Sequence, residues 1–298
     1  MQQALERALQ EGTTAFGEDA SELAFVRYAL ASRTLDNARY DEALRHATAL
    51  RRIVIASGGE AVEPDAEKSA ALMASILEKS KALPEAIEEA LRDWVVAAEK
   101  AKHRLAAGDA ENQLALALGR RGEREAARAH FDRAVEHRRS ALGNDALATL
   151  ETLYNRATFR EASQSLEEAR GDLEHVVATL EAGKSARERE LYESSLHNLG
   201  VLREEQGDSL DAAKHLGRAL ELREERLGRA HASLRPTLVR LAQLNHREER
   251  LVHALALYER ALAIAKAELA ADHPVVIALE AWRAELTQGV GPLALKRN

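Results

Sequence analysis

The sequence predicts an all-α protein, a right-handed superhelical α-solenoid of about six helix-turn-helix repeats that ends in a C-terminal capping helix. Two observations predict this fold. The 298 residues are rich in Ala, Leu, Glu and Arg, which are strong helix formers, and only 4% are aromatic. A pattern of small and large apolar residues also recurs at a period near 42 residues, which is typical of stacked repeats.

The recurring pattern is a stripe of small, large and small apolar residues. Ala212, Leu216 and Ala219 are spaced 0, 4 and 7, so they lie on one face of a helix. The leading alanines of the six stripes are 47, 37, 42, 43 and 42 residues apart. The other five stripes are Ala43/Ala47/Leu50, Ala90/Trp94/Ala97, Ala127/Phe131/Ala134, Ala169/Leu173/Val176 and Ala254/Tyr258/Ala261.

A second signal precedes each clear stripe by about thirteen residues. It is a large apolar residue followed by a small one, as in Leu199-Gly200 and Leu114-Ala115. A turn with Gly122 or Gly207 separates the two signals, and glycine relieves the strain of left-handed backbone at a helix end. Each unit is therefore a first helix, a tight turn, a second helix and a longer connection. Neither helix can bury its apolar face alone, so the pairs are expected to stack.

These signals resemble the tetratricopeptide repeat family. The period near 42 and the pair His273-Pro274 after an extended second helix are similar to the kinesin-light-chain type of this repeat. Glu78 and Arg156 depart from the pattern, since a small and an apolar residue are expected there. The resemblance implies that the first helices line a groove that binds a protein or peptide. Residues that match the family signature are Leu199, Gly200, Ala212, Leu216 and Ala219.

The predicted boundaries follow from these signals. An N-terminal helix and cap are expected in 1–23, the repeat array in 24–287, and a flexible tail in 288–298. The array closes with a capping helix at 273–287, and the glycine-rich segment 57–67 is expected to be a loop and a hinge. The expected repeat limits are about 24–60, 68–107, 108–146, 147–186, 190–230 and 232–270.

Composition narrows the class of partner and the compartment. Lys and Arg number 42 and Asp and Glu 49, a net charge of −7, which disfavours general nucleic-acid binding. The chain has no cysteine, so it lacks a disulfide framework and thiolate chemistry. No apolar run approaches the roughly 20 residues that cross a bilayer. We therefore expect a cytoplasmic protein without a nucleic-acid or membrane partner.

The residues that carry chemistry in enzymes form no convincing set. Gly183-Lys184-Ser185 resembles the end of a phosphate-binding loop, but Ala178 stands where that motif needs glycine and the preceding segment is helical. His130 and His137 lie seven residues apart without an evident third ligand. Arg133, Arg138 and their neighbours form a basic helix end, which could contact an anion or simply be solvated. We expect no catalytic residues, no metal and no cofactor.

The first helices supply the candidate ligand contacts. By family resemblance, Asn155 and Asn198 match an asparagine that pairs with a bound peptide, because an amide can donate and accept. Bonding between neighbouring repeats is the alternative for both residues. The other residues expected to face the groove are Tyr28, Ser32, Lys79, Asn112, Gln113, Tyr154, Thr158, His197, Val201, Glu205, Val239, Gln243 and His246.

Three functions remain open at this point. The repeat and the missing catalytic set favour a non-catalytic scaffold or adaptor that binds a peptide or protein segment in its concave groove. The alternative is the sensor or regulatory region of a larger bacterial signalling protein, such as a protein kinase. The third is a hydrolase or phosphatase with a site in the groove. The edges of the end helices would also allow self-association.

Overall fold

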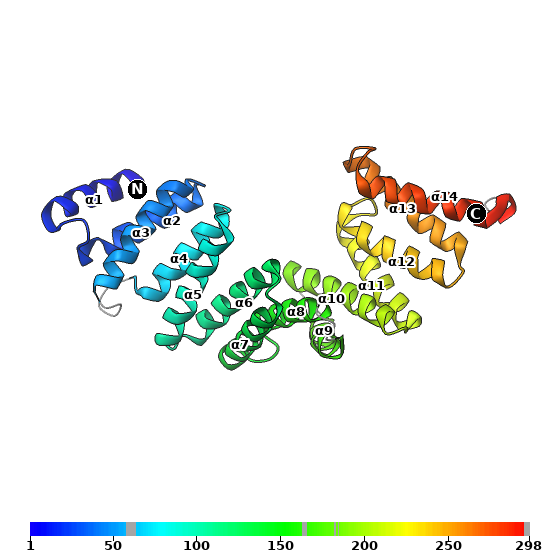
Figure 1. Cartoon of the computed structure of the whole chain (residues 1–298), viewed down its shortest axis with the longest axis horizontal. Helices are drawn as coiled ribbons and strands as arrows, with labels where there is room; N and C mark the ends of the chain where they lie inside the picture. The colour runs from blue at the N-terminus through cyan, green and yellow to red at the C-terminus, as the bar shows by residue number, and fades with distance from the viewer. Residues whose placement is uncertain (58–63, 163–165, 182, 184, 295–298) are drawn as a thin grey trace. The chain divides into compact units, whose positions relative to one another are not determined.

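A computed structural model describes residues 1–57, 64–162, 166–181, 183 and 185–294 of the chain. These residues form 14 α-helices and two short 3-10 helices and contain no strand (Figure 1). The helices are α1 (Gln2–Phe16), α2 (Ala24–Asp36), α3 (Tyr40–Ala56), α4 (Ala66–Lys79), α5 (Pro84–Lys100), α6 (Arg104–Arg121), α7 (Arg124–Leu142), α8 (Leu147–Ala162), α9 (Leu166–Leu180), α10 (Ala186–Glu205), α11 (Ser209–Leu227), α12 (Arg235–Arg247), α13 (Leu251–Glu268) and α14 (Pro274–Ala294).

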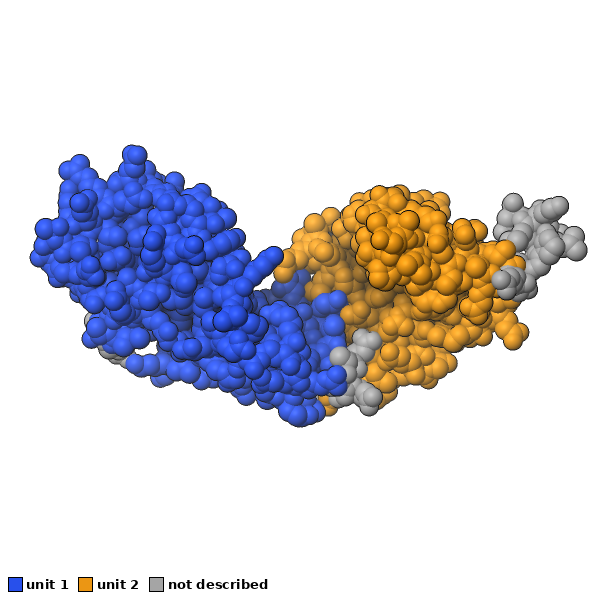
Figure 2. Space-filling model, turned by 45° about the horizontal axis from the view of Figure 1, so that its top comes forward, with its two compact units in different colours: residues 1–159 blue, residues 160–298 orange. Residues whose placement is uncertain are grey.

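The chain divides into two compact units, residues 1–159 and 160–298 (Figure 2). Within the series α1 to α7 and the series α9 to α14, each helix packs against the next one along the chain, so local contacts hold the stack together. This sequential antiparallel packing confirms the all-α solenoid that the repeat pattern predicts. No helix in the described segments is long and apolar enough to cross a membrane.

The tight turns within the repeats share one backbone conformation. Gly122 and Gly207 have φ of 85° and 81°, the left-handed conformation that the sequence predicts for them. Three other turns place Ala38, Lys81 and Glu249 in the same region, with φ between 55° and 59°. A left-handed residue other than glycine costs about 1–2 kcal/mol. Packing of the two helices therefore imposes this turn even where the residue opposes it.

Small residues let the paired helices approach closely. Gly200 on α10 lies directly against α11, where an added Cβ would come within 2.7 Å of Leu216 Cγ and 3.2 Å of the Ala212 carbonyl oxygen. Ala115 and Ala242 occupy the same place in two other repeats and are completely buried. The small residue of the first helix thus packs directly against the apolar stripe of the second helix.

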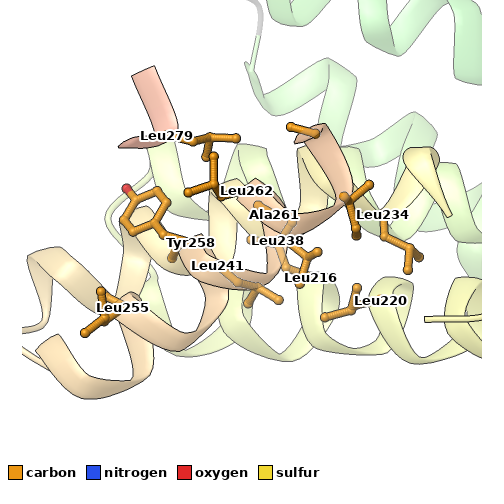
Figure 3. Close-up of a cluster of buried hydrophobic side chains, with 14 of the residues drawn as sticks. Leu216, Leu220, Leu234, Leu238, Leu241, Leu255, Tyr258, Ala261, Leu262 and Leu279 are labelled. Carbon is orange, nitrogen blue, oxygen red and sulfur yellow. The ribbon is translucent and has the colours of Figure 1, made fainter. Parts of the chain in front are cut away.

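The core of the second unit shows how the stack ends. Leu216 and Leu220 of α11 pack with Leu238 and Leu241 of α12, and Tyr258 of α13 joins them (Figure 3). Helix α14 covers this core from the other side. Its Leu279 is buried, and its Trp282 ring lies 5.2 Å from the Tyr258 ring at an interplanar angle of 36°.

Two helix boundaries differ from the sequence prediction, and two predicted segments lie partly outside the described residues. Helix α14 continues to Ala294 rather than ending at 287, because the glycines after that point weaken a helix without forbidding it. Helix α6 begins at Arg104, earlier than the limit of 108. Residues 58–63 of the predicted hinge and 295–298 of the predicted tail lie outside the described residues.

Two largely buried arginines tie the second helix of one repeat to the first helix of the next. In the first unit, Arg138 Nη1 donates to Thr152 Oγ1 at 2.6 Å. In the second unit, Arg223 Nη1 donates to Thr237 Oγ1 at 2.9 Å. Both threonines are completely buried. A buried donor and acceptor that satisfy each other avoid the cost of desolvation, so each pair fixes the register of adjoining repeats.

The fourth repeat lacks this arginine. Leu180 lies at the position of Arg138 and Arg223, and Ser195 lies at the position of the two threonines. The Ser195 hydroxyl is buried and has no hydrogen-bond partner in the part of the chain that the structure describes. No hydrogen bond to a described residue therefore offsets the cost of removing this hydroxyl from water.

We predict that Gly200→Ala destabilises the protein by about 1–3 kcal/mol, because two backbone atoms crowd the new methyl group. Gly217→Ala on α11 is the matched control, since its added Cβ meets nothing within 4 Å and φ is helical. We expect that control to gain about 0.5–1 kcal/mol from helix propensity. Urea unfolding followed by circular dichroism measures both, and equal shifts in the two variants would contradict the packing argument.

We predict that Ser195→Ala leaves the free energy of unfolding unchanged or raises it, because it removes a buried hydroxyl without a partner. Thr152→Val removes the acceptor of Arg138 at similar volume and should cost about 1.5–3 kcal/mol. The same urea titration compares them. A loss in Ser195→Ala as large as that in Thr152→Val would show that the hydroxyl at 195 has a stabilising partner.

Candidate functional site

A groove of about 570 Å³ opens in the second unit between α10, α12 and α14. Three residues predicted to contact a ligand line it, namely His197 of α10 and Val239 and Gln243 of α12. Helices α10 and α12 are the first helices of their repeats. Helix α14 follows the second helix α13, where the first helix of another repeat would lie. The structure thus brings together part of the predicted site on the expected helices.

The sequence prediction missed the wall that α14 contributes. Val275, Ala278, Leu279 and Trp282 line the groove from this helix. Sequence reasoning assigned α14 to capping the core only. Its place after a second helix was the available signal, because a helix there occupies the position of another first helix.

The charged part of the lining is cationic. Arg235 and Arg240 of α12 line the groove, and none of the lining residues is acidic. The nearest carboxylates of these arginines are Glu268 Oε2, 3.8 Å from Arg235 Nη1, and Glu204 Oε2, 4.0 Å from Arg240 Nη1. Neither distance is a hydrogen bond, and Arg235 Nη1 is buried without a hydrogen-bond partner among the described residues. The groove therefore carries two guanidinium groups whose nearest carboxylates lie at ion-pair distance without a hydrogen bond.

His197 is held neutral at the inner end of the groove. Burial, together with the positive charges of Arg223 and Arg240, lowers the pKa of His197 to about 4. Its Nδ1 lies 3.0 Å from the hydroxyl oxygen of Thr237. The imidazole therefore carries no charge at neutral pH.

The other predicted residues of the second unit lie elsewhere. Val201 is 4% exposed and packs in the hydrophobic core, so its side chain does not face solvent. Asn198 on α10 and His246 on α12 are half-buried, Glu205 on α10 is exposed, and none of the three lines the groove.

In the first unit, the Asn155 amide is engaged within the protein. Its Nδ2 donates to Asn112 Oδ1 at 3.1 Å, from α8 to α6. This contact corresponds to the alternative reading, in which the amide bonds a neighbouring repeat. Asn112 is itself only 4% exposed.

The remaining candidates of the first unit line neither of the two hollows described below for this unit. The Thr158 hydroxyl donates to the Tyr154 carbonyl oxygen at 2.9 Å within α8. Tyr28 packs against two apolar clusters. Ser32 and Gln113 are half-buried, and Lys79 is exposed.

Two other hollows lie in the first unit. One of about 210 Å³ lies between α3, α4 and α5 and includes Arg51, Met73 and Val96. The other, of about 420 Å³, follows α2 and includes Arg39 and Ser80. None of the predicted site residues lines either hollow.

His130 and Arg133 of the basic and histidine-rich segment of α7 make contacts within the protein. Arg133 Nε donates to Glu111 Oε1 at 2.7 Å, and His130 contacts the other oxygen of this carboxylate. Burial alone would raise the pKa of Glu111, but hydrogen bonds from His130 and Arg133 lower it overall. Among the described residues, no group of three or more His, Asp or Glu side chains is arranged to hold a metal ion.

The described part of the segment that resembles a phosphate-binding loop forms the N-terminal cap of a helix. Ser185 caps α10, since its hydroxyl accepts from the Glu188 amide at 3.1 Å while the Glu188 carboxylate accepts from the Ser185 amide. This reciprocal pair is a capping box. Lys184 lies outside the described residues.

Comparison with known sequences matches two segments of the chain to models of the tetratricopeptide repeat, residues 112–145 and residues 191–267. No significant match to a curated protein sequence was found. The second segment includes α11 and α12 in full, and therefore part of the groove.

Solved structures with the same fold include three informative relatives. The nearly identical TPR-like repeats of a candidate kinesin light chain from Podosopora anserina are 21% identical, with a TM-score of 0.52 over 60% of this chain and 85% of that one. BtubC (BKLC) from P. vanneervenii is 20% identical, with a TM-score of 0.59 over 82% and 91% of the two chains. The quorum sensor NprR from B. thuringiensis, in its apo form, is 15% identical, with a TM-score of 0.66 over 89% and 71%.

Both kinds of comparison agree with the helix pairs, the stripes and the turns described above. The resemblance that the sequence suggests is therefore confirmed at the level of the repeat and the fold. The chain carries tetratricopeptide repeats, and its fold is that of kinesin-light-chain-like tetratricopeptide-repeat proteins.

Proposed function

We propose that the chain is a non-catalytic interaction module that binds an extended segment of a partner protein in the groove between α10, α12 and α14. The observation that carries the proposal is the lining of this groove, which combines an apolar wall with polar groups that are mostly donors. Tetratricopeptide repeats are generally protein-interaction modules, which agrees with this reading.

The lining suits a peptide better than a small polar metabolite. Val239, Val275 and Trp282 supply apolar surface that a side chain can cover. Arg235, Arg240 and Gln243 supply donors at the edge of that surface. An extended peptide carries one carbonyl acceptor per residue beside its side chains, so it can satisfy both kinds of group at once.

A regulatory region within a larger signalling protein is the second candidate. The observation that favours it is the fold shared with the quorum sensor NprR over 89% of this chain. In that case the same groove would bind the signal or the effector, so the first experiment below serves both readings.

We predict that Ala278→Trp, which fills the groove, weakens binding of a peptide selected by random-library display against the wild-type chain. The loss should be about tenfold or more, roughly 1.4 kcal/mol, when measured by isothermal titration calorimetry. Ala278 lines the groove from α14 and is half-buried.

Leu210→Trp is the matched control, because Leu210 is 83% exposed on α11 and does not line the groove. This variant should bind the selected peptide as the wild type does. Equal affinity in all three proteins would place the binding surface elsewhere, and failure to select any peptide would count against peptide binding itself.

A further inference from the structure

The Thr237 hydroxyl determines where the proton of the groove histidine resides. Thr237 is completely buried on α12. Within the described residues its hydroxyl oxygen has two partners, Arg223 Nη1 at 2.9 Å and His197 Nδ1 at 3.0 Å. A guanidinium only donates, so Thr237 must accept from Arg223.

The hydroxyl proton of Thr237 therefore has one acceptor available. A buried hydroxyl proton without an acceptor is costly, and arginine cannot accept it. His197 Nδ1 accepts the proton only when this nitrogen carries no hydrogen of its own. In a neutral imidazole the hydrogen is then on Nε2.

Two residues of α10 hold the Arg223 guanidinium on the side away from Thr237. Its Nη2 donates to Ser194 Oγ at 3.3 Å, and its Nε lies 3.9 Å from Glu193 Oε2. Glu193 is 2% exposed and accepts two hydrogen bonds from Arg226, at 2.9 Å and 2.6 Å. The series of contacts from Glu193 through Arg223 and Thr237 to His197 is thus held by groups on α10, α11 and α12.

Burial and the positive charges around His197 keep the imidazole neutral. Arg223 faces it from α11 and Arg240 from α12, and both disfavour an imidazolium. Helix α14 contributes Val275, Ala278, Leu279 and Trp282 to the lining, none of which carries a charge. No acidic side chain lines the groove to stabilise a second proton.

We propose that His197 is a specificity-determining residue of the groove, which presents a fixed Nε2–H donor to an oxygen acceptor of the bound segment. This inference rests on the proposed peptide-binding function and names the chemistry that the site recognises. The acceptor is a backbone carbonyl or a carboxylate, and Thr237 and Arg223 are positioning residues. His197 lines the groove while Nδ1 is taken by Thr237, so the Nε2 edge is the one left to a ligand.

The tautomer can be measured without any ligand. In the full chain labelled with ¹⁵N-histidine, long-range ¹H–¹⁵N correlation at pH 7 separates the two tautomers by the ¹⁵N shifts of Nδ1 and Nε2. His197→Gln identifies the signals of residue 197 among the eleven histidines. We expect the Nε2–H tautomer for His197. An Nδ1–H tautomer, or titration of His197 near pH 6.5, would overturn the proposal.

Thr237→Val tests the positioning role, because it removes the hydroxyl at similar volume. The His197 signals should shift toward a mixture of tautomers. Thr152→Val is the matched control, since Thr152 pairs with Arg138 in the first unit, and it should leave the His197 signals unchanged. An unchanged His197 tautomer in Thr237→Val would overturn the assignment. If that variant does not fold, the wild-type spectrum still decides the tautomer.

The ligand arm uses the display-selected peptide. His197→Leu should weaken its binding about tenfold, whereas His197→Gln, which keeps an N–H donor, should stay within about threefold of the wild type. Exchange of each Asp or Glu in the peptide for Asn or Gln separates a carboxylate acceptor from a backbone carbonyl. Wild-type affinity in His197→Leu would overturn the recognition role. If no peptide is selected, peptide binding fails while the tautomer result stands by itself.

Discussion

The stack depends on the close approach of the two helices within each repeat. Where Gly200 meets Leu216, the helices come nearer than any side chain at position 200 would allow. This distance lets the stripe of the second helix fill the space between neighbouring pairs, as Ala212, Leu216 and Ala219 do in the second unit. The first helices then lie side by side, and the residues on their outer face do not pack in the core. The groove is formed from that face.

Stacking also explains which parts of the fold could be predicted. The stripes and the small residues of the first helix recur because each repeat needs the same contact, so they appear in the sequence as a period. The left-handed turns at Ala38, Lys81 and Glu249 carry no such signal, since glycine is absent there. Packing selects the backbone conformation at these positions, and the local sequence does not reveal it.

The candidate site was predictable only in part, and for a related reason. His197, Val239 and Gln243 follow from the register of the first helices, which the stripes define. Trp282 and Val275 were missed, because a terminal helix reads as a cap when no second helix follows it. Whether an amide such as Asn155 meets a ligand or its own protein depends on the neighbour it reaches, here Asn112 at 3.1 Å. Spacing along the sequence does not determine that distance.

The two arginine–threonine pairs show how a structural contact can acquire a second role. Thr152 accepts from Arg138 and donates to the Ala148 carbonyl oxygen at 2.9 Å, so its hydroxyl is satisfied within the stack. Thr237 accepts from Arg223 in the same manner but has His197 as its other partner. The buried network therefore ends at a groove residue in the second unit and at a main-chain carbonyl in the first. His197 thus connects the contacts between repeats to the surface that a ligand would meet.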